Sequence, residues 1–317
     1  MDRGPDQFKY LYPRALINQF PPKLGADCAV VIYSMSMGTA LASESVIVEV
    51  AERLPTAPRL LVELGRLMHN PNVEADEVVA LLRQDPPLVA QIIRMANSVA
   101  YSPPEPVGSL ERAVSLVGFA EAHRLVGVVA AAQLAEQKLA LYPIDAARLR
   151  LNALFVAVMM EELAKWTHER PRSCYTVGLL RTIGMMALER VAPAPGVTAV
   201  PFLESGETAL DAWEQKTWGI TNVEAAEKVL LHWRLPRETA MAIRHHYQPA
   251  GRHNPIIHLL VLAAGAAADL KHGIPGEESY WRLTTETFDQ AGLAPACFPI
   301  ICQKAQRKFD QLRIVVA

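Results

Sequence analysis

The side chains best suited to metal chemistry in this chain are the adjacent histidines His245 and His246. Neutral imidazole binds many divalent metal ions, and a bound ion turns water into a nucleophile near neutral pH. Neighbouring residues on a helix point in different directions, so these two cannot chelate one ion by themselves. A structural role is the plainer interpretation, because histidines at the C-terminal end of a helix complement its dipole.

Other chemical signatures are missing from the sequence. No GxxxxGK[ST] pattern predicts a phosphate loop, and no GxSxG pattern predicts a serine hydrolase. The cysteines Cys28, Cys174, Cys297 and Cys302 form no CxxC pair and no metal-type spacing. We therefore expect isolated reduced thiols in a cytoplasmic protein.

Charge and composition exclude several classes of partner. Of 317 residues, 51% are apolar and 20% charged, with a net charge of −2, so the chain predicts a globular protein without a basic surface for nucleic acid or membrane. The segment Thr221–His246 has a helix-turn-helix outline, but its second helix carries only Arg237 and Arg244 against Glu238. We see no secretory signal, and the apolar run Leu259–Ala268 is too short to span a bilayer.

The elements that would position any site are predicted to be helices, because apolar residues mostly recur every three or four positions along the sequence. Ser109 is a predicted N-cap for a helix that ends at Gly118, and Thr221 and Glu224 form a predicted capping box. The segment Val46–Val50 fits a short strand or a helix equally well. Longer helices are expected at residues 119–139, 148–166 and 174–191.

A set of dipeptides and short motifs occurs in a fixed order along residues 50–270. Its members are Leu54, Pro55, Asp85, Pro86, Asn97, Ser98, Gly178, Leu179, Leu180, Gly184, Trp233, Leu235 and Pro236. With these motifs in this order, the chain resembles the HDOD family. Members of this family are bacterial signalling proteins that are related to HD and HD-GYP phosphohydrolases but lack their metal site. A plainer role is open for Asn97 and Ser98, as a polar pair that ends a helix and ties down the next loop.

The resemblance implies a degenerate metal site. Where the related hydrolases have Gly-Leu-Leu-His-Asp-x-Gly, this chain has Arg181 and Thr182 in place of the His-Asp pair. The vestigial positions are Asn152, Arg181, Thr182, Asn222, His245, His246 and Ala264. A guanidinium cannot ligate a metal, so we expect no metal and no cofactor. A buried Arg181 needs a carboxylate, a carbonyl cluster or an anion beside it, and Asn152 and Asn222 could bond to one another.

The fold that the resemblance implies is all-α, with two packed helical lobes, the second a degenerate HD-type helical domain. The expected divisions are an N-terminal extension (1–49), a first lobe (50–147), the HD-like lobe (148–270) and a C-terminal helical extension (271–317). The leading segment is too short for a receiver, kinase or cyclic-dinucleotide turnover module. We therefore expect such modules to be partners in trans, and homodimerisation stays open.

The favoured function is non-catalytic: signal transduction by protein–protein interaction, with no enzyme activity. One alternative is a phosphate or nucleotide sensor that uses the vacated metal pocket, and another is residual metal-dependent phosphohydrolysis. We expect Arg181 and His245-His246 to approach a groove between the lobes and to attract an acidic or phosphorylated partner, more strongly below about pH 6.5. On this hypothesis Arg181→Glu weakens partner binding with little change in melting temperature.

Overall fold

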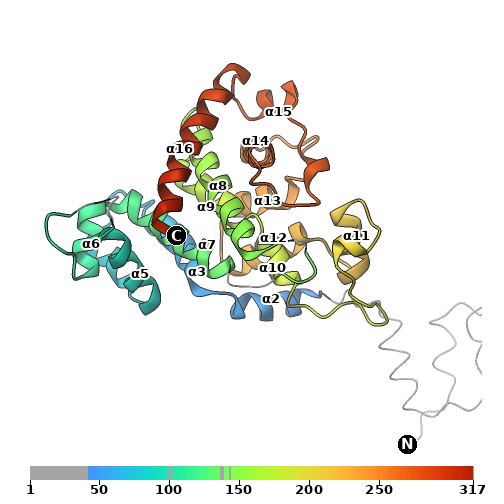
Figure 1. Cartoon of the computed structure of the whole chain (residues 1–317), viewed down its shortest axis with the longest axis horizontal. Coiled ribbons are helices and arrows are strands. Elements are labelled where there is room, and N and C mark those ends of the chain that lie inside the picture. The colour runs from blue at the N-terminus through green and yellow to red at the C-terminus, as the bar shows by residue number, and fades with distance from the viewer. Residues whose placement is uncertain (1–41, 99–100, 102, 136–138, 143, 317) are drawn as a thin grey trace, which may run out of the picture. The chain divides into compact units, whose positions relative to one another are not determined.

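Helices make up the secondary structure of the described residues, apart from an isolated bridge between Leu139 and Ile144. A computed structural model describes residues 42–98, 101, 103–135, 139–142 and 144–316 (Figure 1). The first group of helices is α2 (Glu44–Arg53), α3 (Thr56–Leu67), α4 (Ala75–Leu82), α5 (Pro86–Ala96), α6 (Leu110–Val117) and α7 (Phe119–Ala135). The second group is α8 (Ala146–Ala164), α9 (Pro171–Leu180), α10 (Ile183–Leu188), η3 (Phe202–Glu204), α11 (Leu210–Trp218), α12 (Asn222–His232), α13 (Arg237–His245), α14 (Pro255–Asp269), η4 (Glu278–Tyr280), α15 (Thr285–Gln290), η5 (Pro295–Cys297) and α16 (Phe298–Val316). The all-α prediction is confirmed for the described residues, and Cys28 lies outside them.

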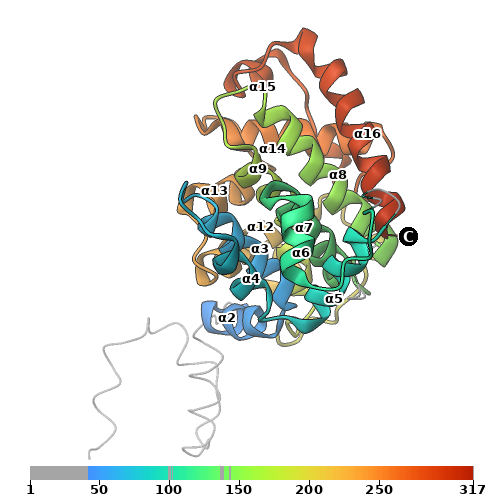
Figure 2. The ribbon, with the colours of Figure 1, turned by 90° about the vertical axis from the view of Figure 1, so that its left-hand side faces the viewer.

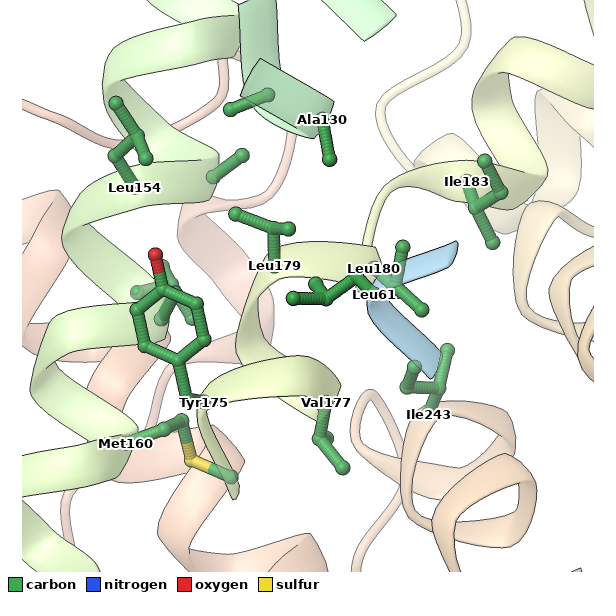
Figure 3. Packing of buried hydrophobic residues seen from close by; sticks show 14 of the residues in the cluster. Leu61, Ala130, Leu154, Met160, Tyr175, Val177, Leu179, Leu180, Ile183 and Ile243 are labelled. Atoms are coloured by element: carbon green, nitrogen blue, oxygen red, sulfur yellow. The ribbon is translucent and has the colours of Figure 1, made fainter. Parts of the chain in front are cut away.

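Helix α9 lies at the centre of the core, and the helices around it come from both groups. It packs against α3 and α7 on one side and against α8, α13 and α14 on others. Figure 3 shows Leu179 and Leu180 of α9 near Leu61 of α3, with Leu154 of α8 and Ile243 of α13 on either side. All these side chains are buried, so α9 is one of the elements through which the two groups of helices touch, together with the contacts of α7 with α8 and of α2 with α12.

Two glycines of the family motif allow helices to approach closely. A Cβ added at Gly178 of α9 would lie 2.8 Å from the Cα of Ala157 and from the carbonyl oxygen of Val156, both in α8. A Cβ at Gly184 of α10 would lie 1.8 Å from the carbonyl oxygen of Asn222, the first residue of α12. Any larger residue at these positions would push the helices apart, which gives the motif a packing role.

Several predicted helix ends are confirmed by capping bonds. The Ser109 side chain accepts from Arg112 N, and Gly118 ends α6 with a φ of +78°. The Thr221–Glu224 capping box opens α12, as predicted. Asp85, which the sequence indicated only as a motif residue, caps α5 by accepting from Leu88 N at 2.9 Å. These caps pair first-turn N–H groups that have no partner within the helix.

Two local predictions need revision. The stretch predicted as one helix over 174–191 is two helices, because α9 ends at Leu180 and α10 begins at Ile183. The turn at Arg181 and Thr182 redirects the chain so that Gly184 can meet α12. Val46–Val50 lies within α2 and is helical, which settles the choice between strand and helix.

The C-terminal helix α16 packs along α8, as Figures 1 and 2 show. By contacts, Ala40–Ala317 forms one compact unit. The boundary expected between residues 147 and 148 stays a prediction. Within the described residues no single helix is long and apolar enough to cross a membrane. Two consecutive helical segments are long and apolar enough only when taken together, but the chain bends by 116° between them. They are Leu110–Val117 and Phe119–Gln133.

Candidate functional site: a buried polar network at the vestigial metal positions

Arg181 lies at the C-terminal end of α9 and is completely enclosed, with 1% of its surface exposed. Its Nη1 donates to Oε1 of Glu277 at 2.7 Å, and its Nη2 donates to Oδ1 of Asn152 at 2.7 Å. The guanidinium also lies over the ring of Trp281, 5.6 Å from its centroid. Arg181 thus has the carboxylate that its burial requires.

Glu277 lies in the segment between α14 and η4 and is also 1% exposed. It accepts a second hydrogen bond from the Tyr247 hydroxyl at 2.5 Å. Burial opposes the charge of Arg181, but attraction to Glu277 and Tyr247 outweighs it and raises the pKa of Arg181 above its ordinary value. The cation is therefore permanent, and its countercharge lies within the same network.

Asn152 and Asn222 do not share a hydrogen bond, since the structure gives each of them other partners. The Asn152 amide donates to the carbonyl oxygen of His272 at 2.7 Å and accepts from Arg181. Asn222 donates its backbone N–H and its side-chain amide to Glu214, at 2.8 and 2.9 Å. The notion that the two asparagines pair with each other is wrong, because each is held by an ionisable group.

Glu214 is the second buried carboxyl group of the network. The Tyr142 hydroxyl donates to it at 2.6 Å, and the Asn222 side-chain nitrogen lies 3.5 Å from the Tyr247 hydroxyl. The Glu214 cluster thereby joins the Glu277 cluster through Tyr247. Burial raises the pKa of Glu214 to about 8, although the hydrogen bonds from Tyr142 and Asn222 act to lower it.

The two histidines have different surroundings. His246 is fully buried, its Nδ1 lies 2.7 Å from the carbonyl oxygen of Ile243, and its ring lies against Tyr247 and Trp281. Burial, with the neighbouring charge of Arg181, lowers the pKa of His246 to about 3. His245 is only half-buried, and burial also lowers its pKa. Protonation of His246 below about pH 6.5, expected from the sequence, does not fit these surroundings.

The expectation that Arg181 and His246 approach a groove between the lobes does not fit their burial. Both are enclosed by protein, and the positive charge of Arg181 is already paired with Glu277. Thr182 is buried beside Arg181, and Ala264 contributes only a buried methyl group from α14. Asn152, Arg181 and Asn222 are thus brought into one connected network, whereas the charges that act on His245 are those of Arg252, Arg244 and Glu227.

The metal ion that HD-type hydrolases hold does not fit these residues. A guanidinium occupies the space between Asn152 and Glu277 and contributes no lone pair to an ion. Across the described part of the chain, no group of three or more His, Cys, Asp or Glu side chains could hold a metal ion. The arrangement can hold helices together through a neutralised charge, and we derive no metal-assisted step from it.

The remaining motif residues have structural roles in the described chain. Asn97 bonds to the backbone of Val107 in both directions, donating at 2.8 Å and accepting at 2.7 Å, so it ties the loop that follows α5. Trp233 is buried at the end of α12, and Pro236 lies directly before α13. Leu54 and Leu235 are buried in the core.

Comparison with known proteins identifies the family. Residues 54–249 match the HDOD domain. The chain belongs to the HDOD domain family. An uncharacterised protein of Treponema pallidum (strain Nichols) is 23% identical over 246 residues, which are 74% of this chain and 47% of that protein. The chain therefore spans about half the length of this curated relative.

Solved structures of this HDOD chain's relatives show the same fold. One is an HDOD domain protein of unknown function from Geobacter sulfurreducens, with a TM-score of 0.62 and 19% identity over 85% of this chain and 96% of that one. A candidate phosphohydrolase from Shewanella amazonensis SB2B has a TM-score of 0.62 and 22% identity, covering 86% and 98%. A candidate signal transduction protein from Marinobacter aquaeolei VT8 also scores 0.62 with 22% identity, covering 83% and 58%. At these identities the likeness establishes the fold alone.

Sequence reasoning missed more than half of the network. Its missed members are Tyr142, Glu214, Tyr247, Glu277 and Trp281. The one available signal was the requirement that a buried Arg181 have an acidic partner, and nothing local indicates which carboxylate serves. Glu277 lies in the segment predicted as a separate C-terminal extension, yet it completes the vestigial site.

Proposed function

We propose that this HDOD chain is a non-catalytic regulator of signal transduction that acts by binding a partner protein in trans. The observation that carries the proposal is the Arg181–Glu277 ion pair, which fills the vestigial metal position with a permanent cation and its own counterion. A site filled in this way stabilises a helical scaffold and does not present a reactive group to a substrate. The name of the Marinobacter aquaeolei protein, a candidate signal transduction protein, agrees with this class of role.

The proposed mechanism is a relay between the two groups of helices. Helix α9 contacts α3 and α7 as well as α8, α13 and α14, so a partner that shifts one group must repack α9 or move it as a body. The Arg181 network fixes the C-terminal end of α9 to α8 and to the segment before η4. A partner would then bias one arrangement of these helices over another by differential contacts.

The two alternative functions lose support from the same geometry. A phosphate sensor built on the vacated metal pocket needs a free guanidinium, whereas that of Arg181 is enclosed and paired. Residual metal hydrolysis needs several ligand atoms that converge on one ion. Here Asn152 accepts a hydrogen bond from Arg181 instead, and Asn222 donates one to Glu214. No observation on the described residues favours either of these two functions.

Two measurements on the full chain test the proposal. The first assays phosphodiester and nucleotide hydrolysis with added Mn²⁺, Mg²⁺ or Fe²⁺ and measures the metal content after chelator-free purification. We expect no metal-dependent turnover and much less than one ion per chain. Stoichiometric Fe, Mn or Zn, together with hydrolysis that a chelator abolishes, would contradict a non-catalytic role.

The second measurement concerns the partner. The tagged chain is purified from its native host, with an unrelated helical protein carrying the same tag as the control, and bound proteins are identified by mass spectrometry. Each specific candidate is then purified and titrated against the chain by calorimetry. We expect saturable binding by a signalling protein, and failure of every specific candidate to bind directly would count against the proposal.

A further inference from the structure

A hollow of about 470 Å³ lies where the segment after α13 meets α14, η4 and the start of α15. Tyr247 and Pro249 line it from the segment after α13, Val261 lines it from α14, and Tyr280 lines it from η4. A volume of this size suits a small organic molecule, because ligand pockets commonly measure about 300–1,000 Å³. The chemistry of its lining indicates which kind of molecule fits.

A row of aromatic rings ends at this hollow. The ring centroids of Tyr247 and Tyr280 lie 4.3 Å apart with an angle of 19° between the planes, so these rings stack. The centroid of the His246 ring lies 4.3 Å from that of Tyr247 and continues the row into the core. His246 and Tyr247 are buried, whereas Tyr280 is only half-buried. Because Tyr280 lines the hollow, a planar molecule there can add a further ring to the row.

One enclosed side chain of the hollow lacks a hydrogen-bond partner. His258 of α14 is 4% exposed, and its Nε2 lies 2.7 Å from the carbonyl oxygen of Arg252. A carbonyl oxygen only accepts, so Nε2 carries the hydrogen, and Nδ1 of the uncharged ring is left as an acceptor. This Nδ1 has no partner among the described residues, although His258 lines the hollow. A buried acceptor of this kind calls for a donor, which an N–H group of a ligand would supply.

The charged groups of the hollow oppose each other. Arg282 and Glu286 both line it and are exposed, and the ion pairs among the described residues include neither of them. A phosphate or carboxylate would be attracted by Arg282 but repelled by Glu286, so a simple anion gains little here. A purely apolar molecule would leave Nδ1 of His258 without a donor. The lining therefore favours an uncharged ring that carries both donors and acceptors on its edge.

We infer that the hollow binds an uncharged planar heterocycle of the nucleobase class. Such a ring stacks on Tyr280 and offers an N–H group to Nδ1 of His258. The edge of a nucleobase also carries acceptors that match the guanidinium of Arg282 and N–H donors that match the carboxylate of Glu286. One ligand of this class thus satisfies the buried acceptor and both charged groups.

This site is distinct from the vacated metal position. Arg181 fills that position and does not line the hollow. Tyr247 belongs to both places, because it lines the hollow and its hydroxyl donates to Glu277. A bound ring would therefore touch a residue of the network that holds the C-terminal end of α9. Nucleobase binding does not depend on a protein partner, so its failure would leave the proposed function standing.

The test titrates adenosine, guanosine, cytidine and uridine separately with the full chain and follows binding by saturation-transfer NMR and calorimetry. We expect saturable binding of at least one of these nucleosides. Ala250→Trp should weaken that binding roughly tenfold or more, because Ala250 is exposed where it lines the hollow and an indole there fills the space. Ala120→Trp on α7 is the matched control, since Ala120 is exposed and does not line the hollow.

A second variant tests the buried acceptor. His258→Gln keeps an N–H group for the carbonyl oxygen of Arg252 but removes Nδ1. We therefore expect roughly tenfold weaker nucleoside binding at an unchanged circular dichroism spectrum. His253→Gln is the control, because His253 is exposed and does not line the hollow. The inference is overturned if no nucleoside binds saturably, or if either variant binds as its control does.

Discussion

Nη1 of Arg181 lies 2.7 Å from Oε1 of Glu277, and the two residues are 96 positions apart in the sequence. This hydrogen bond connects the end of α9 to the segment that follows α14. A buried ion pair thus connects two segments that lie far apart in the sequence.

The first prediction concerns that ion pair. Arg181→Met leaves the Glu277 carboxylate buried without its cation, and loss of one partner of a buried pair costs about 3–5 kcal/mol of unfolding free energy. Arg181→Glu would be at least as harmful, because it places two carboxylates together. This replaces the expectation that Arg181→Glu changes the melting temperature little. Denaturant unfolding measures the loss, with the exposed Arg94→Gln as a control expected to stay within about 0.5 kcal/mol.

The double variant Arg181→Met/Glu277→Gln sharpens this test. Removing both charges takes away the uncompensated carboxylate, so we expect it to be more stable than Arg181→Met alone. If the unfolding free energy of Arg181→Met lies within about 1 kcal/mol of that of the unaltered chain, the ion pair does not hold the helices together.

The second prediction concerns Asn97, which exchanges two hydrogen bonds with the backbone of Val107. Asn97→Ala leaves an N–H and a C=O of the loop unpaired, which costs about 1–3 kcal/mol. Asn72→Ala is the matched control, because Asn72 is exposed on a turn. Thermal unfolding of both variants checks the difference. An unchanged melting temperature together with a lost cellular phenotype would instead make Asn97 part of a contact surface.

Local features of this fold were predictable, because their causes lie within a few residues. Helix α6 begins after Ser109 and ends at Gly118, and a capping box of Thr221 and Glu224 opens α12. The contacts that set these ends join residues three or four positions apart. The break at Arg181 was missed, because it depends on how closely Gly184 approaches α12 rather than on a Pro or Gly breaker at the turn.

The candidate site was predictable only in part, for a related reason. The motif placed Asn152, Arg181 and Asn222 together, and the structure links them through hydrogen bonds. Glu277 and Glu214 were not predicted, since a buried carboxylate carries no local sign of the distant cation or amide that it meets. Tertiary packing alone selects these partners, and the pKa of each group follows from that packing.

The last prediction concerns Glu214, whose pKa burial raises from an ordinary 4.5 to about 8. Between these values the folded chain binds more protons than the unfolded chain, so stability falls as pH rises. The contribution is fully present below about pH 4.5 and is lost by about pH 8. Glu214→Gln keeps the shape but removes the titration, so unfolding free energies measured from pH 7 to 8, above the range in which His246 of the unfolded chain titrates, should fall less with pH in this variant. We use the exposed Glu204→Gln as the control, which should keep the slope of the unaltered chain. Equal slopes in all three proteins would mean that Glu214 stays ionised and that the Tyr142 and Asn222 hydrogen bonds outweigh its burial.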